Sequence, residues 1–419
     1  MSATGKIAEV LFEQALDTYE DQTMMIDKTQ VFTPEGGTMQ NAGNVIWRPT
    51  DHHAPILDGW DLTGQEQDII EQTYPAYLGT PKNDFVKQRA DDMRDISFWE
   101  KRGKASGRQQ ANDLNKSLAT LVKNTGSLFY RDNSTSGFDF ISQGQVIMNE
   151  RQGAMTERSF VLNDRDSNKF AQDLAGRQTV QGRPAQVWPK GMIANNVAEF
   201  DVYTGSFLPQ ITGGAATTTT TAATSFKPEG GSVDSTTFAV TNVDYRKAVI
   251  PVTSSASFAV GDKVTFDGVN AVGLADKTDT GQLMTFTIVS KPDATSVEIY
   301  PKPIAVSDVT LTATEAAYAN VSDVIGSGAT MTRLNTDASA RSNLFWDKDA
   351  IEVVGGTIPA QLLQQYDGMK VINQTLSNGL NMYMIYDGKI EDVTMRYRLF
   401  VWYGLTMKDP SRAGVAVSY

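Results

Sequence analysis

The spacing of apolar and polar positions predicts an amphipathic helix near the start of the chain. Between residues 6 and 20, apolar side chains recur as on one helix face, at Ile7, Val10, Leu11 and Leu16. Glu9, Glu13 and Asp17 follow one another at every fourth position, which stacks them on one side of a helix. This acidic face is either a solvated surface or a docking site for a basic partner.

A second, longer helix is predicted between Ala105 and Tyr130. Its apolar residues share one face, at Leu114, Leu118, Leu121, Val122, Thr125, Leu128 and Phe129. Arg102, Lys104 and Arg108 lie around its expected start, where the helix dipole favours anions over cations. We therefore expect these charges to interact with groups outside the helix.

Two segments before this helix show no clear period. Residues 23–48 are expected to be extended, with turns at 34–37 and 41–44. Residues 50–77 mix Pro, Gly and acidic residues with isolated apolar ones such as Trp60. Long irregular loops are uncommon in compact domains and are usually functional. We expect residues 50–77 to form a loop that contacts something else.

The pattern changes in the second half of the chain. Residues 213–223 are of low complexity and rich in Thr, which predicts a linker. Beyond them, short strands separated by turn residues are predicted at 238–240, 248–252, 263–266, 284–289 and 296–300. This all-β unit ends near Ala340. Apolar runs at 343–354 and 399–405 follow in a mixed context, so a β domain is predicted inside a host domain.

The composition is that of a folded, acidic protein. The 419 residues include 37 Lys and Arg against 49 Asp and Glu, a formal net charge of −12, and 40% are hydrophobic. This length suffices for two or three domains, and the negative charge argues against a surface that grips nucleic-acid phosphates. No apolar run approaches the roughly 20 residues of a membrane-spanning helix. The N-terminus also lacks the features of a secretory signal, so we expect no membrane partner.

Residues suited to catalysis or metal binding are scarce. The absence of Cys excludes disulfides, thiolate nucleophiles and Cys-based zinc sites. His52 and His53 are adjacent, a spacing that rarely closes on one metal, and we expect both in a surface loop. Phosphate-binding and serine-nucleophile motifs are missing. We expect no catalytic residue, metal or cofactor, although the many carboxylates leave a hydrolase as an open alternative.

Short blocks, in order along the chain, resemble a known family. In the first part they are residues 44–49, 59–63, 83–85 and 89–95. In the second part they are residues 261–263, 301–303, 317–321, 343–346, 349–351 and 402–404. Together they resemble the major coat protein of short-tailed, lambdoid double-stranded DNA bacteriophages, over nearly the whole chain. Each block is weak by itself, but the ordered set is specific.

The resemblance implies an α+β protein with the tailed-phage capsid fold. That fold has an N-terminal arm, an extended loop, a spine helix, and peripheral and axial domains, and this subfamily adds an inserted all-β barrel domain. Mapped onto this chain, the parts are the arm at 1–42, the extended-loop region at 43–104, the host domain with the spine helix at 105–221, the inserted barrel at 222–339 and the resumed host domain at 340–419.

The function that the resemblance implies is structural. Copies of a major capsid protein associate into hexamers and pentamers of an icosahedral shell, which encloses packaged double-stranded DNA without sequence-specific binding. A scaffolding protein and a portal protein are the further implied partners, and the protein is expected in the virion after assembly in the host cytoplasm. Expansion of the shell would require two packings of one sequence. The alternative is a secreted or surface β-rich binding protein, suggested by the Thr-rich stretch and the β unit.

The resemblance also implies contact residues. Glu9, Glu13 and Asp17 match acidic positions of the family's arm and are predicted to dock on a basic scaffold surface by salt-sensitive pairing. Contacts between capsomers are predicted for Asp234, Asp244, Arg246, Lys247 and Trp60. The family carries an Asp-rich projecting loop in this region, whereas residues 228–246 are richer in Gly, Ser and Thr. A flexible loop without a partner is therefore an equal alternative.

The tryptophans invite a separate hypothesis. Trp47, Trp60, Trp346 and Trp402 could form an aromatic ligand platform. Trp carries a large burial energy and dominates contacts between subunits. We therefore expect these residues in a core or an interface.

Overall fold

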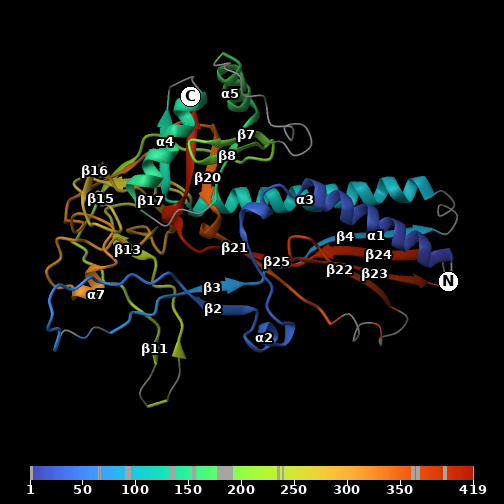
Figure 1. Cartoon of the computed structure of the whole chain (residues 1–419), viewed down its shortest axis with the longest axis horizontal. Helices are drawn as coiled ribbons and strands as arrows, with labels where there is room; N and C mark the ends of the chain where they lie inside the picture. The colour runs from blue at the N-terminus through green and yellow to red at the C-terminus, as the bar shows by residue number, and fades with distance from the viewer. Residues whose placement is uncertain are drawn as a thin grey trace. The chain divides into compact units, whose positions relative to one another are not determined.

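Helices and strands are mixed in the structure, and the chain divides into two compact units. The computed structural model describes residues 3–64, 66, 68–89, 96–132, 137–152, 157–176, 192–233, 236–237, 240–359, 364, 369–389 and 394–418. The first unit comprises Met1–Ile46, Ala76–Leu118 and Ile351–Thr406. The second unit comprises Trp47–Pro75, Ala119–Ala350 and Met407–Tyr419. Figure 1 labels the elements of both units.

The first unit opens with the predicted amphipathic helix, α1 (Ala3–Gln22). Its apolar face is buried, through Ala8, Leu11, Phe12, Ala15, Leu16 and Tyr19. The helix packs closely on α3 (Ile96–Thr125). A Cβ atom at Gly103 would lie 2.6 Å from the Leu11 carbonyl oxygen, and one at Gly107 would lie 2.2 Å from that of Ala15. The two glycines therefore allow the backbones of α1 and α3 to approach each other.

Helix α3 differs from the predicted helix at residues 105–130, because it begins at Ile96 and ends at Thr125. Residues Leu128–Asp132 form a strand, β5, instead. A short continuous apolar run fits a buried helix as well as a buried strand. Here parallel pairing with β26 (Ala413–Ser418) decides for the strand. Gly126 lies at the change, where a Cβ atom would come within 2.9 Å of the Ala413 backbone.

Two sheets complete the first unit. One is antiparallel, in the order β22 (Lys370–Thr375), β23 (Asn381–Lys389), β24 (Thr394–Val401) and β4 (Lys82–Arg89). The other has the order β1 (Gln30–Phe32), β21 (Ile351–Gly355) and β25 (Tyr403–Met407). The predicted apolar run at 399–405 is thus divided between β24 and β25. Helix α3 contacts the first sheet through polar groups, since Gln110 donates to the Leu399 carbonyl at 3.0 Å.

Several shorter elements come between α1 and β4 along the chain. They are η1 (Ile26–Lys28), α2 (Gly36–Asn41), β2 (Val45–Pro49) and β3 (Thr73–Tyr77). The helical turn α2 forms where only turn residues were predicted. Strands β2 and β3 pair with each other, and residues 50–72 connect them.

The second unit contains a mixed sheet. Its order is β5, β26, β20 (Ala340–Asp347), β6 (Arg158–Leu162), β8 (Phe200–Thr204) and β7 (Met192–Val197), with β9 (Gln210–Ile211) paired to β20. Helices α4 (Gly137–Glu150) and α5 (Asp164–Gly176) belong to the same unit. Aromatic rings fill the core beside this sheet, where Phe160 stacks on Phe345 with ring centroids 5.7 Å apart. Trp346 of β20 is fully buried, as expected for a core residue.

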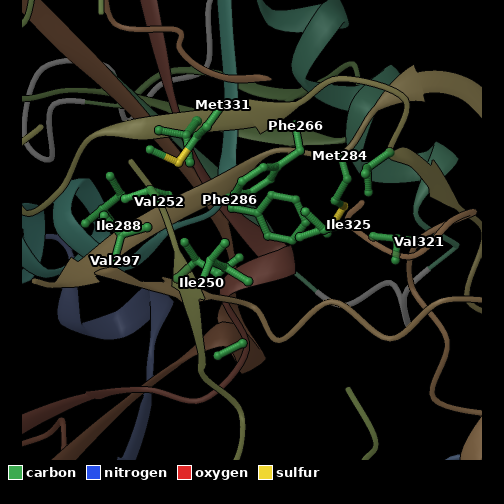
Figure 2. Close-up of a cluster of buried hydrophobic side chains, with 14 of the residues drawn as sticks. Ile250, Val252, Phe266, Met284, Phe286, Ile288, Val297, Val321, Ile325 and Met331 are labelled. Carbon is green, nitrogen blue, oxygen red and sulfur yellow. The ribbon is translucent and has the colours of Figure 1, made fainter. Parts of the chain in front are cut away.

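A six-stranded antiparallel sheet lies in the same unit. Its order is β10 (Thr217–Thr219), β19 (Thr330–Arg333), β14 (Lys263–Phe266), β17 (Phe286–Ser290), β18 (Ser296–Tyr300) and β13 (Ala248–Pro251). The first and last strands meet, because Thr220 forms a β-bridge with Val252 and the Thr253 amide donates to the Thr219 carbonyl at 2.9 Å. The sheet therefore closes into a barrel. Figure 2 shows its core, in which Phe266 and Phe286 meet edge to face among aliphatic side chains.

The prediction of a linker at residues 213–223 was wrong in part, since Thr217–Thr219 form strand β10. β-Branched Thr favours strands, and burial alternates along these three residues. Four of the five predicted strand runs correspond to β13, β14, β17 and β18. The fifth, at 238–240, lies mostly outside the described residues.

Minor elements complete the second unit. They are the hairpin of β11 (Ser232–Val233) and β12 (Val240–Thr241), the hairpin of β15 (Asn270–Val272) and β16 (Asp279–Leu283), α7 (Ala313–Ala316), η3 (Lys348–Ala350) and η4 (Pro410–Arg412). Helix α7 begins with a capping box, because the Thr312 side chain accepts from the Glu315 amide and the Glu315 carboxylate accepts from the Thr312 amide.

Candidate functional site

The acidic face of α1 is open to solvent. Glu9, Glu13 and Asp17 are all exposed, on the side opposite the buried apolar face. Asp21 is exposed too and continues the four-residue spacing by one more turn. The sequence analysis missed Asp21, although its spacing was the available signal. The structure thus brings four carboxylates together on one helix face.

The loop between β2 and β3 carries exposed apolar side chains. Its ends are joined, since the Thr50 amide donates to the Gln72 carbonyl at 2.9 Å. Between these ends the described residues form neither helix nor strand, as predicted. Ile56 is 94% exposed, Trp60 106% and Ile69 75%. Trp60 therefore does not belong to the core of its own chain, and Ile56 is an exposed residue that the sequence analysis did not single out.

Arg246 interacts with groups of its own chain. Its guanidinium binds the Asp244 carboxylate at 2.7 Å and donates to the carbonyl oxygens of Met407 at 2.9 Å and Lys408 at 2.8 Å. Its side chain is only 10% exposed, and it lies over the Tyr300 ring, 5.2 Å from the centroid. This geometry gives Arg246 a role inside the unit, at the point where the barrel meets the C-terminal segment.

The neighbours of Arg246 complete this cluster. Lys247 lies 3.6 Å from the Asp244 carboxylate and keeps 30% of its side chain exposed. Burial by itself would raise the pKa of Asp244, but the hydrogen bond and attraction of Arg246, with the charge of Lys247, hold that pKa below its ordinary value. Asp234, the other acidic residue predicted to contact a capsomer, lies outside the described residues. The role of these residues between capsomers stays a prediction.

The root of the loop is tied down by ion pairs. The Asp51 carboxylate lies 2.9 Å from the Lys408 ammonium and 3.8 Å from the Arg412 guanidinium. Burial opposes the charge on Asp51, but the Lys408 hydrogen bond and the two cations lower its pKa. His53 is half-buried with its ring edge-on to Tyr318, at a centroid distance of 5.0 Å. The expectation of two surface histidines therefore holds only for His52, which is exposed.

A buried lysine joins the barrel to the end of α3. Lys263 of β14 is completely buried. Its ammonium donates to the Lys123 carbonyl at 2.8 Å, to the Thr287 hydroxyl at 2.9 Å and to the Gly126 carbonyl. These three acceptors match the three N–H groups of an ammonium, while burial and the charge of Lys123 lower the pKa of Lys263 well below its usual range. The sequence analysis noted the block 261–263 only as a family resemblance and assigned Lys263 no role.

The remaining tryptophans pack inside the fold. The Trp402 indole donates to the Gly79 carbonyl at 2.6 Å, and Trp47 is half-buried. Trp346 is buried as well, so these three side chains lie in packed positions. Arg102 binds both oxygens of Asp84 at 2.7 Å, so this cation does interact outside its helix, as expected.

The described residues contain neither a metal-ligand cluster nor a membrane-spanning helix. Within them, no three His, Asp or Glu side chains are grouped so that they could hold a metal ion. Among the same residues, no helix combines the length and apolar character needed to cross a bilayer.

Comparison with known proteins decides which family the chain belongs to. The family model described as "P22 coat protein - gene protein 5" matches residues 1–418. The chain belongs to the P22 coat protein family. It is therefore a bacteriophage major capsid protein, a subunit of an icosahedral shell and a component of the virion. This excludes the alternative of a secreted β-rich binding protein.

Solved capsid structures are similar to the chain. The capsid of cyanophage P-SCSP1u is 10% identical, with 94% of this chain and 86% of that chain covered and a TM-score of 0.43. The mature capsid of bacteriophage PhiM1 is 10% identical, with 93% and 85% covered and a TM-score of 0.42. The I-domain of the CUS-3 coat protein is 29% identical, with 29% of this chain and 96% of that domain covered and a TM-score of 0.21.

Proposed function

We propose that this capsid protein assembles into hexamers and pentamers with the help of a scaffolding protein, around DNA that enters through a portal. The match of the coat protein family over residues 1–418 carries the proposal. Its role is structural and needs no catalytic residue, metal or cofactor. Assembly takes place in the host cytoplasm, and the net charge of −12 keeps the shell from gripping the phosphates of the packaged DNA.

The domain boundaries follow the closed barrel in this proposal. The inserted domain runs from β10 to β19, which moves its start a few residues before the expected Ala222. Residues 50–72 are the extended loop, and the arm ends before β2. The exposed Ile56, Trp60 and Ile69 would be buried against neighbouring subunits, as apolar side chains at interfaces usually are.

Electron microscopy of purified chains tests the proposed assembly. The full-length protein is mixed with the scaffolding protein of its phage and imaged by negative stain, next to samples that lack one component. We expect closed shells of uniform size only in the complete mixture. Single particles at every concentration would contradict the proposal.

The scaffold contact is assigned to the acidic face of α1. Four exposed carboxylates on one face attract a basic surface by pairing that weakens as salt rises. We expect the double charge reversal Glu13→Lys with Asp17→Lys to lower the scaffold content of the assembled particles several-fold, measured on stained gels of purified procapsids.

A matched control makes this test specific. Glu100→Lys with Asp323→Lys changes the net charge by the same amount at exposed positions outside α1. This control should keep normal scaffold content. If procapsids of the α1 variant also contain the normal amount, the acidic face does not dock the scaffold.

A further inference from the structure

A small pocket, open on one side and lined by both polar and apolar groups, lies in the second unit. Its volume is about 140 Å³, and four segments wall it: the root of the extended loop with Asp51 and His53, the end of α4 with Arg151, the barrel with Tyr300, and the C-terminal segment with Lys408. For comparison, an engineered cavity of about 150 Å³ holds a benzene molecule. The space is therefore large enough for a small ligand.

Arg151 is the unusual group in this wall. Its side chain is buried, with 8% of the residue exposed. Neither Nε nor Nη1 has a hydrogen-bond partner among the described residues. Burial lowers the pKa of Arg151 to about 10, with Glu150 opposing this effect, so the guanidinium is charged at neutral pH. A buried charge with unpaired donors is costly unless a ligand pairs with it.

Several other polar groups of the wall have partners within the fold. Arg246 pairs with Asp244, and Lys408 pairs with Asp51. The Tyr318 hydroxyl donates to the Ile70 carbonyl at 3.3 Å. Burial and the nearby Lys277 lower the pKa of His53, so its ring is neutral and keeps one N–H donor. None of the described groups of the wall, including the carboxylates of Asp51 and Asp409, accepts a hydrogen bond from Nε or Nη1 of Arg151.

We propose that this cavity binds a small oxyanion of the phosphate class, held by the guanidinium of Arg151. The planar fork of an arginine donates two parallel hydrogen bonds to a phosphate or carboxylate, and these charge-assisted bonds are stronger than neutral ones. Such an anion would link the loop root, α4, the barrel and the C-terminal segment through one site. The site does not depend on the proposed scaffold contact.

The two histidines allow a direct test in the full-length wild-type chain. His53 lines the cavity, whereas His52 is exposed and does not. The protein is labelled with ¹³C at its histidine rings, and spectra are recorded during a titration with sodium phosphate and with sodium chloride at equal ionic strength. We expect a saturable shift of the His53 signal with phosphate only, and no such shift of His52.

Thermal unfolding of matched variants tests whether Arg151 holds the anion. Phosphate should raise the unfolding midpoint of the wild type by about 2 °C or more once the site is saturated. Arg151→Met should lose this increment. Arg108→Met, which removes an exposed arginine of α3, should retain it. If Arg151→Met does not fold, the phosphate titration of the His53 signal in the wild-type protein tests the proposal without this variant.

Each other outcome overturns the proposal. Equal effects of phosphate and chloride on His53 would mean that the cavity holds only water. An undiminished phosphate increment in Arg151→Met would place the anion elsewhere. A short DNA duplex serves as a third titrant: a His53 shift with the duplex but not with inorganic phosphate would make this a nucleic-acid contact in place of a site for a free oxyanion.

Discussion

At the scale of single residues, Lys263 is a buried link between the barrel and the end of α3. A fully buried ammonium is tolerated here because three oxygen acceptors surround it. Two of them are carbonyls at the end of α3, which have no partner within the helix. Lys263 thus acts as a C-terminal cap supplied by a strand that is distant in sequence.

Replacement of this lysine gives the first residue-scale prediction. Lys263→Met keeps the apolar stem and leaves the Lys123 carbonyl without a partner, so we expect a loss of about 1–3 kcal/mol in the free energy of unfolding. Urea unfolding followed by circular dichroism measures it. Lys101→Met, at an exposed position of α3, is the control and should stay within about 0.5 kcal/mol of the wild type. Equal stability of the two variants would show that the cap contributes nothing.

The ion pair of Asp244 and Arg246 predicts that the stability of the fold depends on pH. Because the folded-state pKa of Asp244 lies below its ordinary value of 3.8, the ionised carboxylate stabilises the fold above that value. This contribution is lost as the pH falls through the folded-state pKa. We expect Asp244→Asn to be less stable than the wild type at about pH 6 and the difference to shrink below about pH 4.

Urea unfolding at several pH values measures this effect. Asp58→Asn, which changes an exposed carboxylate of the loop at residues 50–72, controls for general acid effects. A stability difference between Asp244→Asn and the wild type that stays constant down to about pH 2 would argue against the ion pair as its cause.

At the scale of elements, the contact of α1 with α3 depends on backbone approach. Gly107 lies where a Cβ atom would be 2.2 Å from the Ala15 carbonyl oxygen, and the obstacle is backbone that cannot rotate away. The acidic face of α1 is held in place by this contact. The geometry of a proposed docking surface therefore depends on a glycine of another helix.

Gly107→Ala tests this dependence. Alanine favours a helix by about 1 kcal/mol over glycine, but the steric overlap should displace α1 and cost about 1–3 kcal/mol. We expect faster hydrogen exchange of the α1 amides. Gly37→Ala, in helix α2 with no heavy atom within 4 Å of the added Cβ, is the control and should not slow or speed exchange in α1. Unchanged hydrogen exchange of the α1 amides in Gly107→Ala would show that α1 does not need this close backbone approach to stay in place.

At the scale of the whole molecule, we propose that the loop at residues 50–72 contacts other copies of the protein. Exposed apolar side chains are normal singly, but Ile56, Trp60 and Ile69 share one irregular segment. Ordering such a segment is costly in a monomer and is offset by contacts formed on assembly.

Trp60→Ser separates folding from assembly. Because Trp60 is fully exposed, we expect the monomer's free energy of unfolding to change by less than about 0.5 kcal/mol. Scaffold-driven assembly, followed by light scattering, should be several-fold slower. Val309→Ser removes another apolar side chain that is 96% exposed, outside the loop, and should assemble normally. Wild-type assembly of Trp60→Ser would exclude this side chain from the subunit contacts.

Local patterns along the chain determined several elements by themselves. The apolar spacing of residues 6–20 specifies α1 and its exposed carboxylates, because helix faces follow from a period of 3.6 residues. The alternating runs of the barrel, such as Lys263–Phe266, are equally local. Residues 50–77 lack any period, and their described part is irregular up to β3.

Tertiary structure decided what local patterns leave open. The apolar residues 128–130 suit a helix or a strand, and only pairing with β26, far along the chain, makes them a strand. The Thr-rich residues 217–219 become a barrel strand for the same reason. Lys263, Arg151 and Arg246 are ordinary surface residue types whose burial arises from distant segments that surround them. Hydrogen bonds and desolvation act between neighbours in space, and a linear pattern does not record which neighbours those are.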